Sequence, residues 1–86
     1  MTAHRPEFLA ESTAGWCGHY HRSPRAADRC LGEREGRVVV QHYVGTWYRA
    51  PIVELHGEFC IATAGNVQRA YHYRTGDPAP ISEVLK

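Results

Sequence analysis

The sequence has almost no lysine. Nine of its ten basic residues are arginine, and the only lysine is Lys86. Arginine codons are rich in G and C whereas lysine codons are rich in A and T, so this bias indicates a GC-rich genome rather than selection for guanidinium chemistry. Nine acidic residues leave a formal net charge of +1. A charge this small gives the whole molecule no electrostatic steering toward nucleic acid or an anionic membrane.

Long apolar segments are also missing. No run approaches the roughly 20 apolar residues that a membrane-spanning helix needs, and the first residues lack the apolar centre of a secretory signal. The sequence therefore predicts a cytoplasmic protein. It contains three cysteines, an odd number, which suits free thiols or thiolate ligands in a reducing compartment better than a disulfide scaffold.

Recognisable catalytic patterns are absent as well. Ser12, Ser23 and Ser82 lie in no strand–turn–helix nucleophile elbow. There is no phosphate-binding loop of the Gly-x-Gly-x-x-Gly type, and no group of acids and bases surrounds a candidate nucleophile. We therefore expect a protein that is not an enzyme.

The chain has the length of one domain. Its 86 residues, 43% of them hydrophobic, suffice for a modest globular core. The pattern divides the chain into a polar N-terminal arm over 1–14, a single globular domain over 15–80 and a C-terminal tail over 81–86. Within the arm, the segment 6–11 is expected to form one helical turn or to fray.

A short strand followed by a short helix is predicted at the start of the domain. Residues 16–21 have the pattern of a strand. Ser23 is a good helix N-cap, and Pro24 suits the first helical position, where no N–H group is needed. Apolar residues then recur at helical spacing up to residue 31, and Gly32 is a typical helix C-cap.

The second half of the chain has the pattern of β-strands. Residues with β-branched and aromatic side chains, separated by tight turns, predict strands over 37–44, 47–55, 59–64 and 67–74. Pro51 lies inside the second of these. Because proline cannot donate a hydrogen bond to a neighbouring strand, we expect that strand to lie at an edge of the sheet or to carry a bulge.

Together these elements predict an α+β fold. A short N-terminal strand–helix unit would pack on an antiparallel meander of about four strands, with the helix covering one face of the sheet. The alternative is a small SH3-like half-barrel, because short strands joined by tight turns can curl closed.

The most informative cluster combines cysteine with histidine. Four candidate metal ligands lie close together in the chain: Cys17, His19, His21 and Cys30. Alternate residues of a strand share one face, so the first three can converge, and the helix can bring the fourth back over them. Zinc favours four such sulfur and nitrogen ligands in a tetrahedron, and a site closed in this way has a structural role. Core packing of the cysteines and a Cys17–Cys30 disulfide are open alternatives.

A second group of residues suggests a binding surface, because tyrosine, tryptophan and arginine dominate the hot spots of protein interfaces. The residues expected to engage a partner protein are Arg22, Arg25, Arg29, Tyr43, Trp47, Tyr48, Arg49, Tyr71 and Tyr73. The alternative is a zinc-stabilised nucleic-acid-binding module or small regulator, in which the rings stack on bases and the arginines hold phosphates. The near-neutral charge favours the protein partner.

One segment carries a resemblance. The run Cys17-Gly18-His19-Tyr20-His21-Arg22-Ser23, followed by a helix with Ala26-x-x-x-Cys30, resembles short uncharacterised proteins of actinobacteria and their phages. The resemblance implies a phage or mobile-element source. By analogy with small phage proteins, it further implies a non-enzymatic protein that engages, and thereby inhibits, a protein of the host.

Overall fold

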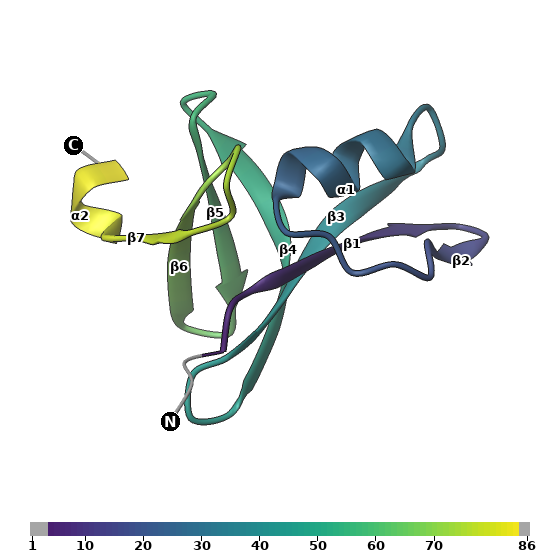
Figure 1. Ribbon diagram of the computed structural model, residues 1–86. Helices are drawn as coiled ribbons and strands as arrows, with labels where there is room; N and C mark the ends of the chain where they lie inside the picture. Colours follow the sequence, from purple (N-terminus) through teal and green to yellow (C-terminus); the bar gives the residue numbers. More distant parts are fainter. Residues whose placement is uncertain (1–3, 85–86) are drawn as a thin grey trace.

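The computed structural model describes residues 4–84 of the chain. Within this range, seven strands form one antiparallel sheet in the order β2-β1-β3-β4-β5-β6-β7, and two short helices accompany it (Figure 1). The strands are β1 (Glu7–Ser12), β2 (Gly15–Trp16), β3 (Gly36–Tyr43), β4 (Trp47–Leu55), β5 (Phe59–Ala64), β6 (Val67–His72) and β7 (Pro78–Ala79). The helices are α1 (Pro24–Leu31) and α2 (Ile81–Val84).

The predicted fold class is wrong. The helix and the four predicted strands are present, but they do not form a strand–helix unit on a separate four-strand meander. They belong to a seven-stranded sheet that begins within the expected N-terminal arm. The half-barrel alternative did not anticipate a seven-stranded sheet of this order either.

The main cause of the error is β1. All six of its residues pair with β3, from Glu7 opposite Gln41 to Ser12 opposite Gly36. Phe8, Leu9 and Ala10 are consecutive and all buried, so the strand is covered on both faces at its centre. Such a strand gives a continuous apolar run instead of an alternation, and this run is indistinguishable from a piece of helix in the sequence. The expected helical turn in the arm is therefore wrong.

The two ends of the chain differ from the predicted arm and tail. The boundary expected between residues 14 and 15 falls within the tight turn that joins β1 to β2. At the other end, α2 supplies Val84 to the buried side chains. Residues 1–3 of the predicted arm and 85–86 of the predicted tail lie outside the described residues.

Pro51 has a different consequence from the one predicted. The strand that contains it, β4, lies at the centre of the sheet, so the expected edge position is wrong. Residues 47–51 of β4 pair with β3, and residues 52–55 pair with β5. Proline therefore lies where β4 exchanges one partner strand for the other, and its missing N–H group falls at this change. Figure 1 shows β5 and β6 turned away from β1 and β3 on the two sides of β4.

The sheet curls around its core, so strands that are distant in the strand order touch through their side chains. The Phe8 ring of β1 lies 5.6 Å from the Tyr71 ring of β6, edge to face. The Tyr71 hydroxyl is 3.2 Å from Nδ1 of the buried His42. The buried core is formed by Phe8, Ala27, Val38, Val40, Tyr48, Ala50, Cys60, Ala62 and Tyr71.

Helix α1 forms as the sequence predicted. The Ser23 hydroxyl accepts a hydrogen bond from the Ala26 N–H at 3.2 Å, and Pro24 occupies the first turn. Gly32 ends the helix with φ near 61°, a conformation that favours glycine. The buried side of α1 faces β1 and β3 (Figure 1). An eight-residue helix is too short to be stable by itself, so its position depends on such contacts.

None of the helices within residues 4–84 has the length and apolar character that crossing a membrane requires.

Candidate metal centre

The segment after β2 runs back along β1 and positions the candidate ligands. The Cys17 N–H donates to the Ala10 carbonyl at 2.9 Å. Further along, Phe8 and His21 exchange two backbone hydrogen bonds of 2.8 and 2.7 Å. These hydrogen bonds hold Cys17 beside Ala10 and His21 beside Phe8, two nearby residues of β1.

Between Cys17 and His21, the chain contains two residues more than regular pairing with β1 would need. In a regular continuation of the β1–β2 register, His19 would lie opposite Phe8, but His21 lies there. The backbone accommodates the excess in a loop, where Gly18 adopts φ near +81°. This loop moves His19 away from β1. The predicted continuous strand over 16–21 is therefore wrong, although the segment stays beside β1.

The loop and α1 bring all four candidate ligands together. The ligand atoms of Cys17, His19, His21 and Cys30 lie within 4.8 Å of one another. Cys17 Sγ is 3.6 Å from His21 Nε2, and Cys30 Sγ is 3.8 Å from His19 Nδ1. Bond lengths of about 2.3 Å to sulfur and about 2.0 Å to nitrogen put tetrahedral sulfur and nitrogen ligands about 3.5 Å apart. The predicted convergence of these four side chains is thus confirmed.

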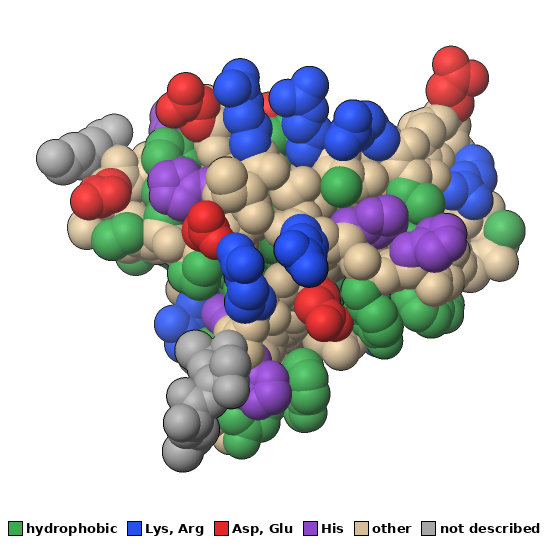
Figure 2. All heavy atoms as spheres, viewed as in Figure 1, with side chains coloured by type: hydrophobic (Ala, Val, Ile, Leu, Met, Phe, Trp, Pro, Cys, Tyr) green, Lys and Arg blue, Asp and Glu red, His purple; other side chains and the backbone are tan. Residues whose placement is uncertain are grey.

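The candidate ligands lie at the surface beside α1. Figure 2 shows two histidine side chains next to each other below the helix, close to a group of hydrophobic side chains. His19 is exposed, and the other three are partly buried. A cation could therefore reach the site from solvent without unfolding the protein.

The surroundings of Cys17 and His21 favour the protonation states that a metal needs. Partial burial alone would raise the pKa of the Cys17 thiol, but its hydrogen bonds outweigh this and hold the pKa below its usual value. One of them comes from the Ala10 N–H, 3.4 Å from the sulfur. Burial, and then the neighbouring His19, lower the pKa of His21. Zinc binds thiolate and neutral imidazole.

Cys30 behaves in the opposite way. Burial and then the nearby Cys17 raise the pKa of the Cys30 thiol. Two thiolates this close repel each other unless a cation lies between them. The helix end that carries Cys30 is held by Arg34, whose Nε donates to the Leu31 carbonyl at 3.1 Å. The other end of the same guanidinium donates to the Cys30 carbonyl.

The remaining cysteine is separate from this group. Cys60 is fully buried in β5, and burial, followed by the charge of Glu54, raises the pKa of its thiol to about 12. Its structural role is core packing, as its position between apolar residues indicates.

This difference predicts the reactivity of the three thiols. In the zinc-free protein, an aromatic disulfide reagent at pH 8 should modify Cys17 first and Cys30 more slowly, because both are partly exposed but only Cys17 has a lowered pKa. Cys60 should react only on unfolding, since it is buried and almost entirely protonated. One equivalent of zinc should protect the first two thiols, which the absorbance of the released thiolate would report. Equal reaction rates for all three thiols would contradict this assignment.

The residues predicted to engage a partner do not share one surface. Tyr48 and Tyr71 are buried, so their assignment to a binding surface is wrong. Tyr73 is partly buried and packs against the core. Exposed arginines lie on and before α1, on the side of the sheet that the helix covers: Arg22, Arg25 and Arg29. Exposed residues of the opposite face are Tyr43, Trp47 and Arg49.

The face opposite α1 also carries two aromatic residues that the sequence analysis did not assign to a partner. Trp16 lies opposite Glu11 in the register, and its ring is 5.4 Å from the Tyr20 ring. Both side chains are about half exposed, at 49% and 56%. Their alternation with Cys17, His19 and His21 could have revealed this, because alternate side chains point to opposite sides.

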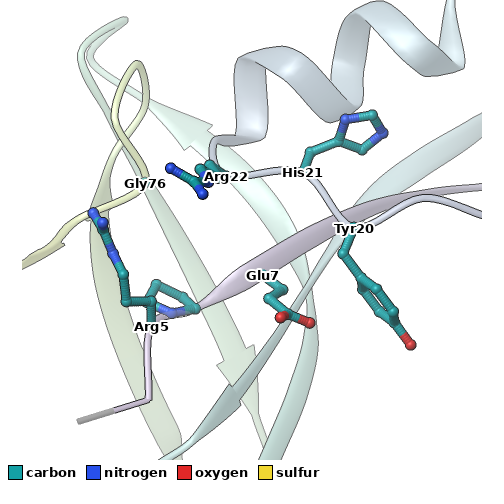
Figure 3. A pocket seen from close by; sticks show the side chains of 7 residues that line it. Arg5, Glu7, Tyr20, His21, Arg22 and Gly76 are labelled. Carbon is teal, nitrogen blue, oxygen red and sulfur yellow. The ribbon is translucent and has the colours of Figure 1, made fainter. Parts of the chain in front are cut away.

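A shallow cavity of about 300 Å³ lies next to the loop (Figure 3). In this view the His21 ring points away from the cavity and toward α1. Arg5 and Arg22 reach toward the turn at Gly76, and Arg5 pairs with Asp77 at 2.7 Å. A Cβ atom at Gly76 would lie 2.1 Å from the Arg22 carbonyl oxygen, so only glycine allows this close approach.

Comparisons of the chain with protein-family models, with curated proteins and with solved structures find no match. The resemblance of residues 17–30 to short actinobacterial and phage proteins, and the source that it implies, therefore stay predictions.

Proposed function

We propose that Cys17, His19, His21 and Cys30 bind one Zn²⁺ ion in a closed, structural site. The support is the convergence of two sulfur and two nitrogen atoms within 4.8 Å, the donor set and spacing typical of structural zinc. Three ligands come from the loop beside β1 and one from α1. The ion would therefore connect two segments that each have little structure of their own.

A site of this kind stabilises the fold and leaves no position for a substrate. Four protein ligands fill a tetrahedral zinc ion, whereas catalytic zinc keeps a coordination position for water. The group of side chains that converges here contains no carboxylate to act as a general base. We therefore assign this centre a structural role and propose a binding function for the protein.

We further propose that it binds a partner protein through the face of the sheet opposite α1. This aromatic face is defined by Trp16, Tyr20, Tyr43 and Trp47. Residues directly opposite each other in antiparallel strands share a face, and the register places Tyr43 opposite Trp47 and Glu11 opposite both Trp16 and Arg37. The four rings thus belong to one face, which neither α1 nor α2 covers within the described residues.

The charge of the aromatic face suits a protein better than a nucleic acid. Glu11 accepts from Arg49 at 2.5 Å and lies 3.5 Å from Arg37. One carboxylate therefore partly neutralises both guanidinium groups. Trp47, at 64%, is among the most exposed large side chains of the described chain. Exposed aromatic rings on a weakly charged surface are typical anchors of protein interfaces.

The aromatic face can be tested with a matched pair of variants. The immobilised zinc-loaded protein and an Arg25→Ala variant should capture the same partner from cell lysate, whereas Trp16→Ala/Trp47→Ala should lose it. Loss of one hot-spot tryptophan typically weakens binding by about 2 kcal/mol or more. The purified partner should then protect β3 and β4 from hydrogen exchange. Equal capture by the tryptophan variant, or protection confined to α1, would contradict the proposal.

A further inference from the structure

Among residues 4–84, three arginines contact a carboxylate and six do not. Arg5, Arg37 and Arg49 each contact a carboxylate. Among residues 4–84, no carboxylate lies within ion-pair distance of Arg22, Arg25 or Arg29, the three exposed arginines at the start and on the outer side of α1. We call these three residues the arginine face. Arg34, Arg69 and Arg74 are also among the six, so the distinctive feature of α1 is that three of them are grouped there.

The geometry of the helix directs these charges into solvent. Residues of an α-helix follow each other by about 100°. Ala27 and Leu31 define the buried side, so Arg25 and Arg29 point almost directly away from the sheet. Asp28 lies on the flank toward β4, in a groove that it lines with Glu54 and Tyr73. Figure 2 shows basic side chains gathered along the edge of the molecule that α1 forms in Figure 1.

This arrangement costs free energy in the isolated protein. Arg25 and Arg29 are four residues apart and therefore neighbours on the helix surface, and like charges at this spacing destabilise a helix by about 0.2–0.5 kcal/mol, which Asp28, three residues after Arg25, partly offsets. The helix has only eight residues and is marginal by itself. An anion bound between the two guanidinium groups would convert this repulsion into attraction.

We propose that the arginine face binds the phosphate backbone of nucleic acid, without base specificity. Guanidinium groups form paired hydrogen bonds with phosphate oxygens, and the spacing along α1 presents several of them to one strand. This activity goes beyond the partner protein proposed above and uses the opposite side of the sheet. Because Cys30 connects α1 to the metal centre, the binding surface also depends on the zinc site.

The expected affinity is that of non-specific binding. Such complexes have Kd values of about 10⁻⁴–10⁻⁶ M at physiological salt, and the slope of log K against log salt is about −0.9 for each phosphate contact on duplex DNA. Three arginine contacts therefore predict a slope of about −2.7. A net charge of +1 adds no long-range attraction to DNA, so the slope should reflect local arginine contacts.

The test is fluorescence anisotropy of a labelled 20-base-pair DNA duplex, titrated with the zinc-loaded protein between 25 and 200 mM NaCl. Arg25→Ala/Arg29→Ala should bring the slope to about −0.9, since each lost phosphate contact removes about 0.9. Arg25→Lys/Arg29→Lys should retain most of it. The matched control, Arg49→Ala/Arg69→Ala, removes two positive charges away from α1 and should bind as the wild type does. Circular dichroism would show that each variant is folded.

Three results would overturn the proposal. The first is an unchanged salt slope in Arg25→Ala/Arg29→Ala, which would place any binding elsewhere. The second is no change in anisotropy at 25 mM NaCl with 1 mM protein. The third is tighter binding of a labelled glutamate-rich peptide than of the duplex, which would identify an acidic protein segment as the ligand of this face. None of these results would affect the proposed aromatic face.

Discussion

Removing zinc should lower the Tm of this protein by about 15–30 °C. A ligand present at 1,000 times its Kd stabilises the folded state by about 4 kcal/mol, and in a domain of this size each kcal/mol corresponds to about 4–8 °C. The effect is large because the ion joins α1 to the loop beside β1, which leaves regular strand pairing between Cys17 and His21. Calorimetry before and after chelation would measure it.

Cysteine variants supply the control for this prediction. Cys17→Ser/Cys30→Ser should have nearly the same Tm with and without zinc, since both thiolate ligands are lost. Cys60→Ala removes a buried thiol outside the metal centre, so it should lower both values and keep their difference. A zinc-dependent Tm in the first variant, or its absence in the wild type, would exclude the proposed site.

The second large effect should come from Phe8→Ala, with a loss of about 3–5 kcal/mol in the free energy of unfolding. Phe8 is fully buried, and its ring meets Tyr71 across the curled sheet. The same strand positions the metal centre, because Phe8 pairs with His21 and Ala10 with Cys17. Urea unfolding of the zinc-loaded protein would measure the loss.

Tyr20→Ala is the matched control for Phe8→Ala. It also deletes an aromatic ring, but one that is 56% exposed, so we expect a loss of about 1 kcal/mol or less. Similar losses for the two variants would mean that β1 is a peripheral arm, as its sequence suggested, and not a central strand of the core.

The elements that the sequence predicted well are those determined by nearby residues. Ser23, Pro24 and Gly32 mark both ends of α1 through interactions within a few residues. The strands of the second half are separated by turns whose glycines adopt positive φ, such as Gly45 and Gly65. These signals act locally, so they do not depend on the position of any other element.

The errors concern long-range packing. The alternation in β4 separates Tyr48 from Trp47 and Arg49, but it does not say which side is buried. That depends on β5 and β6, because the Tyr48 hydroxyl on the buried side donates to the carbonyls of Ala62 and Val67. In the same way, Pro51 is compatible with a central strand only because β4 changes partners there. No local pattern in the sequence indicates that β1 belongs to the sheet. None indicates that β4 changes its partner strand at Pro51 either.

The candidate ligands were predictable although their local structure was not. A regular strand would have placed Cys17, His19 and His21 on one face, and the actual loop also brings them together. The residue types, and the short distance along the chain to Cys30, were sufficient to predict that the four side chains converge. Of the aromatic face, only Tyr43 and Trp47 were assigned to a partner, although the alternation of Trp16 and Tyr20 with the candidate ligands already places these two rings on the other side.

X-ray absorption at the zinc edge tests the central claim most directly. We expect one bound zinc ion per chain, with two sulfur atoms at about 2.3 Å and two nitrogen atoms at about 2.0–2.1 Å. Cys30→Ser should reduce the sulfur count to one and leave the nitrogen shell in place. A shell of oxygen and nitrogen without sulfur in the wild type, or an unchanged sulfur count in Cys30→Ser, would contradict the Cys17–His19–His21–Cys30 centre.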